Sequence, residues 1–289
     1  MKSLKRLVAG ALKEDIGQED ITTAKTVPPE SRCRVRLVAK QNGVLSGIEV
    51  FRLAFDLLHA GVGGWKSLAD GSRFSKGDEI ASFKGDTRAV LSAERTALNF
   101  LARLSGVATL TAKYVAAVEG IEVRICDTRK TTPLLRDLEK KAVVHGGGMN
   151  HRYNLFNGIL IKENHIAAAG GIRKAIKSAA SGAHHLMKIE VEVTSLDGFD
   201  EALRAGADAI MLDNMGLEDL REAVRRARRK KVVLEASGNV TLKTVRPIAE
   251  TGVHVISAGA LTHSAPAVDF SLLITEEKRG TAGKKGIKN

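Results

Sequence analysis

The sequence has few cysteines, few aromatic residues and no long hydrophobic run. Its two cysteines, Cys33 and Cys126, stand far apart and outside any metal-ligand spacing, which disfavours both a disulfide framework and a zinc site. Aromatic residues make up 4% of the chain, so few rings are present to stack on nucleic-acid bases. No stretch reaches the roughly 20 apolar residues that a membrane-spanning helix needs. These absences predict a cytoplasmic protein with neither a nucleic acid nor a membrane as its partner.

Positive charge, in contrast, is abundant. The 45 lysines and arginines exceed the 33 acidic residues and give a net charge of +12, which favours an anionic partner. Composition alone does not choose between a nucleic acid, a membrane surface and a phosphorylated small molecule. One cationic run, residues 225–231, ends a predicted outer helix. Cations there stabilise the helix dipole and face solvent, so we interpret the run as a solvated surface.

The first hundred residues predict an α+β domain, and the 289-residue chain is long enough for a second one. The N-terminal segment is amphipathic but lacks the uninterrupted apolar run of a signal peptide. Residues 32–40 alternate between charged and apolar and predict a strand with one exposed face, and a helix near 48–59 and a strand near 79–83 follow. A further helix, with Ser92 as its N-cap and Gly106 at its end, is predicted to join the two domains.

After this helix, short apolar strands alternate with amphipathic helices, which is the pattern of a parallel (β/α) barrel. The predicted strands are residues 122–126, 158–161, 186–193, 209–212, 232–234 and 253–256. The predicted helices are residues 134–144, 172–180, 196–205, 217–229 and 242–250. We therefore expect the second domain to be built around a parallel sheet.

Polar residues close or follow each apolar strand. In strand order they are Asp127 with Arg129, Lys162, Glu190 with Glu192, Asp213, Glu235 with Ser237, and Ser257. A strand that emerges into solvent also becomes polar, and at any single position that explanation is as good as a functional one. The active site of an α/β barrel lies at the carboxyl ends of its strands, so the whole set favours a site there.

Residues 127–165 gather cations, and we expect them to organise this site. Around the glycine triplet 146–148 the stretch contains the cations Arg129, Lys130, His151, Arg152 and Lys162. Such a concentration predicts an anionic substrate. Two alternatives remain open: His151 as a loop histidine satisfied by its neighbours, and Lys162 as a Schiff-base lysine of the kind that barrel aldolases use.

Long motifs in a fixed order give the chain a family resemblance. They are EDIGQEDITT at 14–23, ERTALNFLARLSGVAT at 94–109, DTRKTTP at 127–133, GGGMNHR at 146–152, LIKENHI at 160–166, LDNM at 212–215 and EASGN at 235–239. They resemble the motifs of the quinolinate phosphoribosyltransferases over nearly the whole chain. Asn157 stands where that family has aspartate, and Leu134 stands where a glycine usually follows the proline. We expect both departures to alter the local loop geometry without changing the family to which the motifs point.

The resemblance implies an α/β fold class with two domains. An N-terminal α+β sandwich domain would comprise residues 1–105 joined by the C-terminal segment 266–289, and an open (β/α) barrel would comprise residues 106–265. We expect the tail from Thr275 onwards to be loose, because it is polar and rich in glycine.

The activity that the resemblance implies is the condensation of quinolinate with phosphoribosyl pyrophosphate. It would yield nicotinate mononucleotide, CO2 and pyrophosphate in de novo NAD biosynthesis. One alternative is a related phosphoribosyltransferase that acts on nicotinate or another acidic ring. A more distant alternative is a basic binding protein built on an inactive barrel.

The implied quinolinate site is cationic, because quinolinate has two adjacent carboxylates and guanidinium groups bind carboxylates through paired donors. The resemblance assigns this binding to Arg129, His151, Arg152 and Lys162. It also implies that Arg95 of a second subunit completes the pocket, in a homodimer or a hexamer built from it. An ordinary solvated helix arginine is the alternative for Arg95.

The second substrate needs different groups. Glu192 and Asp213 suit Mg²⁺, which binds one or two carboxylates together with substrate oxygens, although both could also be strand-end acids paired with nearby cations. The resemblance assigns Lys130 to the pyrophosphate, and Lys130, Glu192 and Asp213 would be the catalytic residues. Backbone amides of small-residue loops bind phosphate, and ordinary strand-to-helix turns are the alternative for such loops. The two candidate loops contain Ser237, Gly238 and Asn239, and Ser257 and Gly259.

Overall fold

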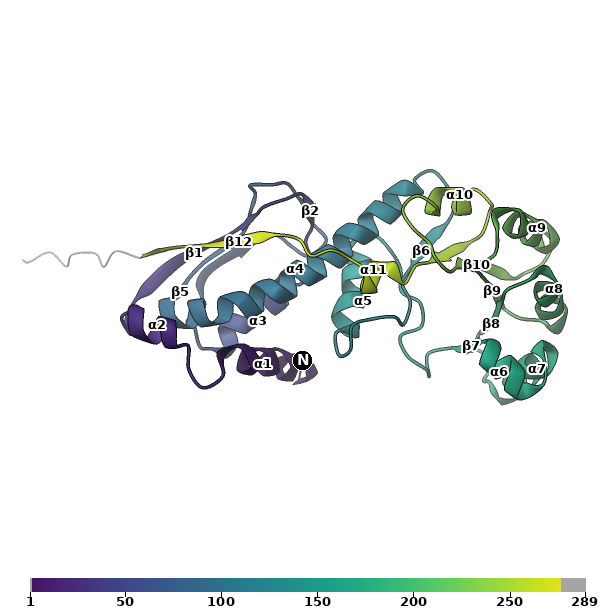
Figure 1. Ribbon diagram of the computed structural model, residues 1–289, viewed down its shortest axis with the longest axis horizontal. Coiled ribbons are helices and arrows are strands. Elements are labelled where there is room, and N and C mark those ends of the chain that lie inside the picture. Colours follow the sequence, from purple (N-terminus) through teal and green to yellow (C-terminus); the bar gives the residue numbers. More distant parts are fainter. Residues whose placement is uncertain (1, 277–289) are drawn as a thin grey trace, which may run out of the picture. The chain divides into compact units, whose positions relative to one another are not determined.

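The computed structural model describes residues 2–276, which divide into two compact units (Figure 1). The first comprises residues 2–102 together with 268–276, and the second comprises residues 103–267. The boundaries expected from the sequence lie close to these limits. None of the described helices is both long and apolar enough to cross a membrane.

The first unit is built on an antiparallel sheet in the strand order β12-β1-β5-β3. Its strands are β1 (Arg32–Ala39), β3 (Gly63–Ser67), β5 (Glu79–Asp86) and β12 (Phe270–Glu276), beside a small sheet of β2 (Gly43–Val44) and β4 (Arg73–Phe74). Its helices are α1 (Lys2–Ile16), α2 (Ile21–Thr26), α3 (Ile48–Leu57) and the first part of α4 (Thr87–Ala117). Exposed residues alternate in β1 with buried ones such as Val35 and Leu37, which confirms the predicted strand with one exposed face.

The last described strand belongs to this same sheet. β12 pairs with β1 in antiparallel register along its whole length. The expectation of a loose tail is therefore wrong for Thr275 and Glu276, because β1 supplies hydrogen-bond partners for their backbone. The rest of that expected tail, residues 277–289, lies outside the described residues.

The second unit contains a parallel sheet in the order β6-β11-β10-β9-β8-β7. The strands are β6 (Arg124–Cys126), β7 (Ile159–Ile161), β8 (Ile189–Val193), β9 (Ala209–Asp213), β10 (Val233–Ser237) and β11 (Val255–Ser257). The helices, besides the end of α4, are α5 (Arg136–His145), α6 (Glu163–Ala169), α7 (Ile172–Gly182), α8 (Leu196–Ala205), α9 (Leu217–Ala227), α10 (Val245–Ala249) and α11 (Ala260–His263). β6 and β7 are the edges of this curved sheet, so the structure confirms an open (β/α) barrel.

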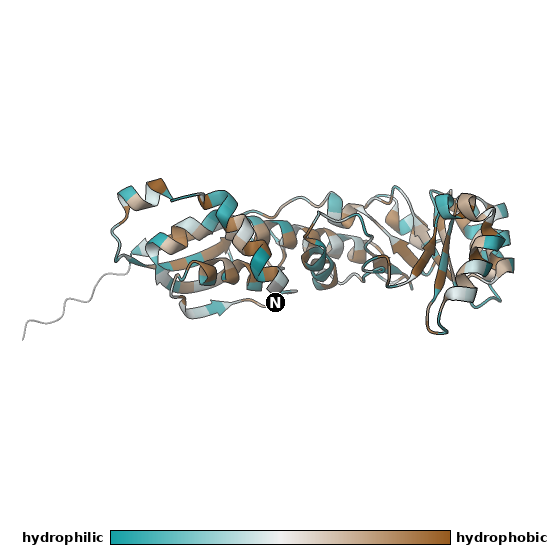
Figure 2. Ribbon diagram, turned by 90° about the horizontal axis from the view of Figure 1, so that it is seen from below, coloured by the Kyte–Doolittle hydropathy of each residue, from teal (hydrophilic) through white to brown (hydrophobic). Residues whose placement is uncertain are grey.

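Figure 2 shows the strands of this barrel mostly in the hydrophobic colour, whereas the surrounding helices carry hydrophilic residues. The pattern agrees with the burial of Ile210, Leu212 and Leu234, none of which is more than 1% exposed. The apolar runs of the sequence therefore form the barrel core, and the polar residues that close them reach its rim.

The helix predicted to join the domains is longer than the sequence suggested. α4 extends from Thr87 to Ala117, so Gly106 lies inside it and does not end it. Gly106 serves packing instead, because an added Cβ would come within 2.2 Å of the Pro266 carbonyl oxygen. Ser92 is not the N-cap either, because the helix begins at Thr87, and the Ser92 hydroxyl donates to Asp20 Oδ2 at 2.9 Å.

Candidate active site

The second unit contains a cavity of about 690 Å³ at the carboxyl ends of its parallel strands. Small-molecule sites typically measure roughly 300–1,000 Å³, so the cavity suits that class of ligand. Every predicted site residue except Arg95 lines it, namely Arg129, Lys130, His151, Arg152, Lys162, Glu192, Asp213, Ser237, Gly238, Asn239, Ser257 and Gly259. Arg95 is an exposed residue of α4 in the first unit.

The strands bring acidic and hydroxyl side chains to one edge of the sheet. In β8, Glu190 and Glu192 alternate with buried residues, so both face the same side. β9 ends at Asp213 and β10 ends at Ser237, and these two residues are paired in register. The parallel register therefore places groups that are distant in sequence beside one another at the cavity.

A buried carboxylate shapes the loop that follows β6. Glu139 is fully buried and accepts hydrogen bonds from the backbone N–H of Thr132 at 2.9 Å and from its hydroxyl at 2.8 Å. Arg103 Nη2 lies 2.8 Å from Glu139 Oε1. On the other side of the loop, the Thr262 hydroxyl donates to the Lys130 carbonyl oxygen at 2.7 Å. These contacts fix the backbone that presents Lys130 to the cavity.

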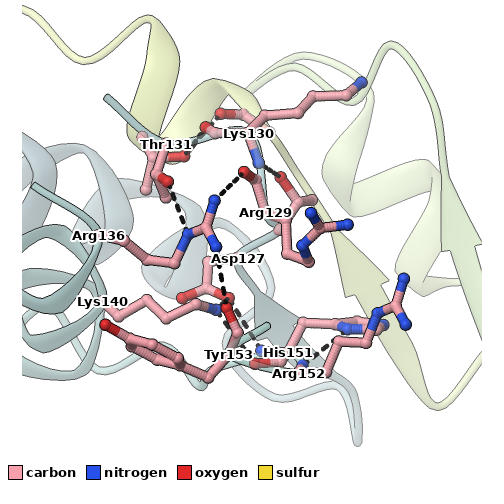
Figure 3. A network of polar contacts seen from close by, with 12 residues as sticks. Asp127, Arg129, Lys130, Thr131, Arg136, Lys140, His151, Arg152 and Tyr153 are labelled. Atoms are coloured by element: carbon pink, nitrogen blue, oxygen red, sulfur yellow. Dashed lines mark hydrogen bonds and ion pairs between the residues drawn. The ribbon is translucent and has the colours of Figure 1, made fainter. Parts of the chain in front are cut away.

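Arg136 ties this loop to the next one. Its Nε donates to the Thr131 hydroxyl at 3.0 Å, and two other guanidinium nitrogens donate to the carbonyl oxygens of Arg129 and Tyr153, each at 3.3 Å. Figure 3 shows the result: the side chains of Arg129 and Arg152 extend from separate loops towards the same side of the network. The two guanidinium groups thus converge on the cavity.

Both converging arginines have a donor without a partner. The Nε atoms of Arg129 and Arg152 are buried and make no hydrogen bond within the described residues. Burial, and then the positive charge of Arg129, lowers the pKa of Arg152 below its ordinary value. Unpaired buried donors and neighbouring like charges are both unfavourable, so the arrangement is suited to an anion that supplies acceptors.

The backbone of His151 is held by a buried ion pair. Lys140 Nζ contacts Asp127 Oδ1, and the two side chains are 3% and 0% exposed. Asp127 Oδ1 accepts the His151 backbone N–H at 2.9 Å, and Lys140 Nζ donates to the His151 carbonyl oxygen at 3.1 Å. Burial raises the pKa of Asp127, and the hydrogen bond from Lys140 partly offsets that effect.

The ring of His151 is engaged on both nitrogens. Its Nδ1 accepts the Arg152 backbone N–H at 2.8 Å, and its Nε2 lies 3.0 Å from Glu190 Oε2 and 3.6 Å from Glu235 Oε2. Burial lowers the pKa of His151, and the hydrogen bond to Glu190 acts in the opposite direction. His151 therefore lines the cavity while its nitrogens face protein groups, as the satisfied-histidine alternative predicts.

Lys162 and Glu192 form an ion pair at the cavity. The Lys162 side chain is 45% exposed, whereas a lysine nucleophile is activated by desolvation. This exposure and the carboxylate partner argue against the Schiff-base alternative. They also place one cation and one acid of the predicted site in direct contact.

Asp213 stands at the end of β9 beside a strained turn. Its Oδ2 accepts the Asn214 side-chain amide at 3.0 Å, and Asn214 Oδ1 accepts the Asn239 amide at 2.9 Å. Gly238 has φ of 93°, and a Cβ there would lie 2.4 Å from the Asn214 side chain. Only glycine fits at this position, so the EASGN motif encodes a close packing of two strand ends.

The loop after β11 packs on a cavity lysine. A Cβ at Gly259 would come within 3.0 Å of Lys130 Cδ, so the glycine leaves room for that side chain. Ser257 is 1% exposed, and its hydroxyl faces the buried Glu235 carboxyl. Small residues here expose backbone to the cavity, which suits contact with a phosphate group.

The glycine triplet has a packing role that the sequence did not reveal. A Cβ at Gly146 would lie 2.4 Å from the Ala108 carbonyl oxygen, and one at Gly148 would lie 2.7 Å from Thr111 Cγ2. None of the three glycines lines the cavity. They let the end of α5 approach α4 closely, and the cations on either side of them form the site.

Comparison with known proteins agrees with this geometry. Residues 20–105 match the family model described as quinolinate phosphoribosyl transferase, N-terminal domain, and residues 107–273 match the corresponding C-terminal domain. The chain belongs to the quinolinate phosphoribosyltransferase family. The sequence resemblance, the α/β fold class and the enzyme class are thereby confirmed.

Relatives within this family cover nearly the whole chain. A "Probable nicotinate-nucleotide pyrophosphorylase [carboxylating]" of Bacillus subtilis is 42% identical over 94% of this chain and 93% of that protein. The "Nicotinate-nucleotide pyrophosphorylase [carboxylating]" of Mycobacterium leprae is 40% identical over 91% of this chain and 94% of that protein. The crystal structure of NadC from Streptococcus pyogenes is 42% identical, with a TM-score of 0.89 over 94% of this chain and 96% of that one.

The two departures from the family pattern lie outside the cavity lining. Leu134 is 85% exposed and has φ of 65°. This left-handed conformation favours glycine, which explains why glycine is usual at this position of the quinolinate phosphoribosyltransferase motif. Asn157 is exposed in the loop before β7. Neither change alters the charge of the cavity.

Sequence reasoning missed several supporting residues. Asn214 lines the cavity, while Glu139 and Lys140 position the loops around it. Glu190 and Glu235 were noted as strand-end acids but received no role. Asn214 and Glu235 stand inside the family motifs LDNM and EASGN, which was a usable signal, whereas nothing local marks Glu139 as the partner of Arg103.

Proposed function

We propose that the protein is a quinolinate phosphoribosyltransferase, which forms nicotinate mononucleotide, CO2 and pyrophosphate in NAD biosynthesis. The observation that carries the proposal is the pair of converging guanidinium groups, Arg129 and Arg152, each with a buried Nε that lacks a partner. Family membership and relatives named as carboxylating enzymes support it. The cationic cavity has a suitable volume for the substrates.

Quinolinate is held through its carboxylates. Arg129 and Arg152 supply paired donors, and Lys162 supplies a third cation at the same cavity. These groups suit a substrate with two adjacent carboxylates better than nicotinate, which has one. Turnover of nicotinate is therefore the less favoured alternative.

The reaction needs positioning and charge stabilisation more than covalent chemistry. The pyridine nitrogen bonds to the anomeric carbon of the ribose while the carbon–oxygen bond breaks and its electron pair leaves with pyrophosphate. The positive ring then accepts the electron pair of the adjacent carbon–carboxylate bond, CO2 departs, and a proton takes its place on the ring carbon. Lys130 stabilises the leaving pyrophosphate, and Glu192 and Asp213 stabilise positive charge on the ribose.

The 5-phosphate of the second substrate is held by backbone amides at two adjacent strand ends. The loops are residues 237–239 at the end of β10 and 257–259 at the end of β11, and all six residues line the cavity. β10 and β11 are neighbours in the sheet, so the two loops lie side by side. This matches the frequent use of late strands for phosphate in barrels.

Magnesium fits one carboxylate of the cavity better than the other. Asp213 offers hard oxygen ligands beside the neutral amide of Asn214, whereas Glu192 Oε2 is already paired with Lys162. We therefore assign Asp213 as the principal ligand and Glu192 to the ribose. When bound, Mg²⁺ would neutralise charge on the pyrophosphate.

The assembly proposed from the family resemblance is a homodimer with a shared site, from which a hexamer could be built. Arg95 is exposed and does not line the cavity, so it would act in the cavity of a second copy. Leu134, Leu155 and Phe156 are 85%, 71% and 78% exposed on the loops next to the site. Large apolar side chains exposed together are typical of a protein interface.

The predicted cellular setting stays a cytoplasmic one without a nucleic-acid partner. Cys33 and Cys126 are buried and form no disulfide. In the cationic run, Arg225 and Arg226 pair with Glu222 on the same helix, which supports a solvated surface.

The proposal is tested by supplying phosphoribosyl pyrophosphate, Mg²⁺ and either quinolinate or nicotinate. We expect nicotinate mononucleotide together with stoichiometric CO2 from quinolinate, measured with substrate labelled in the leaving carboxylate. Product from nicotinate alone would overturn the assignment. Salt-dependent binding to DNA or RNA without any phosphoribosyl transfer would favour a binding protein instead.

A further inference from the structure

A buried cluster of three titratable side chains adjoins the cavity and has no place in the chemistry above. Its members are His151, Glu190 and Glu235, whose side chains are 14%, 13% and 6% exposed. One nitrogen or oxygen atom from each lies within 4.8 Å of the others. Glu190 and Glu235 do not line the cavity, so they reach the substrate only through His151.

The hydrogen bonds of His151 define which nitrogen carries the proton. Nδ1 accepts the Arg152 backbone N–H at 2.8 Å and must therefore keep its lone pair. The proton of the neutral ring is then on Nε2, which donates to Glu190 Oε2 at 3.0 Å. A metal ion would need the Nε2 lone pair and is disfavoured, because metal-binding histidines normally carry a proton on the other nitrogen.

Two carboxyl groups of the cluster lie close together and out of water. One oxygen atom of Glu190 and one of Glu235 lie within 4.8 Å of each other and of the His151 ring, and the Ser257 hydroxyl also faces the Glu235 carboxyl. Two charged carboxylates so close together in a buried setting are strongly unfavourable, whereas a neutral carboxyl group can donate to a neighbouring acid. Burial, followed by the negative charge of Glu190, raises the pKa of Glu235 to about 7.

We propose that His151, Glu190 and Glu235 form a positioning cluster for Arg152, in which Glu235 is a neutral acid that donates to Glu190. The proposal rests on the proposed function, because it gives these residues a purpose in binding the substrate carboxylate. Glu190 accepts from Glu235 on one side and from His151 Nε2 on the other. His151 then acts as a rigid connection to Arg152.

The contacts around residues 151 and 152 leave part of the Arg152 guanidinium group for the ligand. Asp127 and Lys140 hold the His151 backbone, and the two glutamates hold its ring. Arg152 is held by its backbone N–H and by Nη1, which donates to the Gly158 carbonyl oxygen at 3.0 Å. Its Nε stays buried and unpaired. A tilt of the imidazole would displace this donor.

A comparison of two substitutions at Glu235 tests the cluster by kinetics. Glu235→Gln cannot ionise but keeps the shape, the neutrality and a donor, and we expect its KM for quinolinate to stay within about twofold of the unmodified protein. Glu235→Asp keeps an acid but withdraws it by one methylene, and we expect KM to rise on the order of 10- to 100-fold through misplacement of Arg152. The KM for phosphoribosyl pyrophosphate should change in neither. Glu218→Gln, at an exposed carboxylate, is the matched control.

Equal impairment of the two Glu235 variants would overturn the neutral acid, and an unaffected Glu235→Asp would overturn the positioning role. Thermal unfolding of both variants separates misplacement from loss of fold. If the unmodified protein fails to turn over quinolinate, the proposed function fails, and the next measurement still decides the cluster.

The tautomer of His151 can be measured without substrate. ¹⁵N NMR of imidazole-labelled protein at pH 7 should show a neutral His151 ring protonated on Nε2, identified by loss of its signals in His151→Gln. The same tautomer should persist in Glu235→Gln. A doubly protonated ring, or a proton on Nδ1, would overturn the assignment whatever the enzyme's activity.

Discussion

At the scale of single residues, the site is defined by groups that the protein leaves unsatisfied. Arg129 and Arg152 share one cavity, and each has a buried donor without an acceptor. Nearby buried charges such as Asp127 and Lys140 are paired within the protein. The contrast separates the cations proposed to bind ligand from the structural ones, which the sequence alone could not do.

Replacement of either arginine by alanine should weaken quinolinate turnover. Loss of one partner from a buried charged contact costs about 2–5 kcal/mol, so kcat/KM should fall on the order of 30-fold or more. Arg129→Ala is the cleaner variant, because Arg152 also donates to the Gly158 carbonyl oxygen. Steady-state kinetics would check this, with the exposed Arg221→Ala as control. An unchanged kcat/KM in Arg129→Ala would contradict its role.

The pKa of Glu235 predicts how stability depends on pH. Because its folded pKa, about 7, exceeds the ordinary value of 4.5, the folded state binds more protons between those values and loses stability as pH rises through them. The Glu235→Gln variant does not lose stability in this way, because glutamine does not titrate. The variant should therefore gain stability relative to the unmodified protein between pH 5 and pH 8, as measured by urea unfolding. A difference that does not vary with pH would argue against a neutral Glu235.

At the scale of elements, strand register and glycine packing assemble the site. The register of β9 with β10 places Asp213 beside Ser237, and Gly238 permits the close approach of Asn214. The order of strands and helices was predictable from hydrophobic periodicity. The length of α4 was not, because a glycine inside a helix and a glycine that ends one look alike until the opposing Pro266 is known.

Two glycine substitutions should separate these cases. Gly106→Ala forces a Cβ to within 2.2 Å of the Pro266 carbonyl oxygen and should destabilise the protein by about 1–3 kcal/mol. Gly10→Ala, in α1, meets no atom within 4 Å and should stabilise its helix by roughly 0.5–1 kcal/mol. Chemical denaturation measures both. A Gly106→Ala variant as stable as Gly10→Ala would show that the close approach is not restrictive.

At the scale of the whole molecule, the cavity is lined by the second unit alone and Arg95 belongs to the first. A shared site in a homodimer would bring Arg95 of one copy to the cavity of the other. The exposed Leu155 and Phe156 beside the site offer apolar surface for such an interface. A shared site therefore predicts how much activity mixed dimers should recover.

Mixing inactive Arg95→Ala and Lys162→Ala subunits should restore activity. Random exchange makes half of the dimers mixed, each with one intact site, so recovery should reach roughly a quarter of the unmodified activity. Arg129→Ala mixed with Lys162→Ala is the matched control, because both residues line the same cavity and no intact site can form. If subunit exchange is verified and the first mixture stays inactive, the shared site is wrong.

The sequence by itself determined the family, the α/β class and the residues that gather at the cavity. Hydrophobic periodicity follows from burial along each strand, and the motifs preserve local chemistry. Only the tertiary structure decided how these residues divide their roles. It paired Lys162 with Glu192, enclosed His151 between two acids, and left the Nε atoms of the cavity arginines unpaired. Pairing and burial depend on distances across separate strands, and residue order along the chain does not encode them locally.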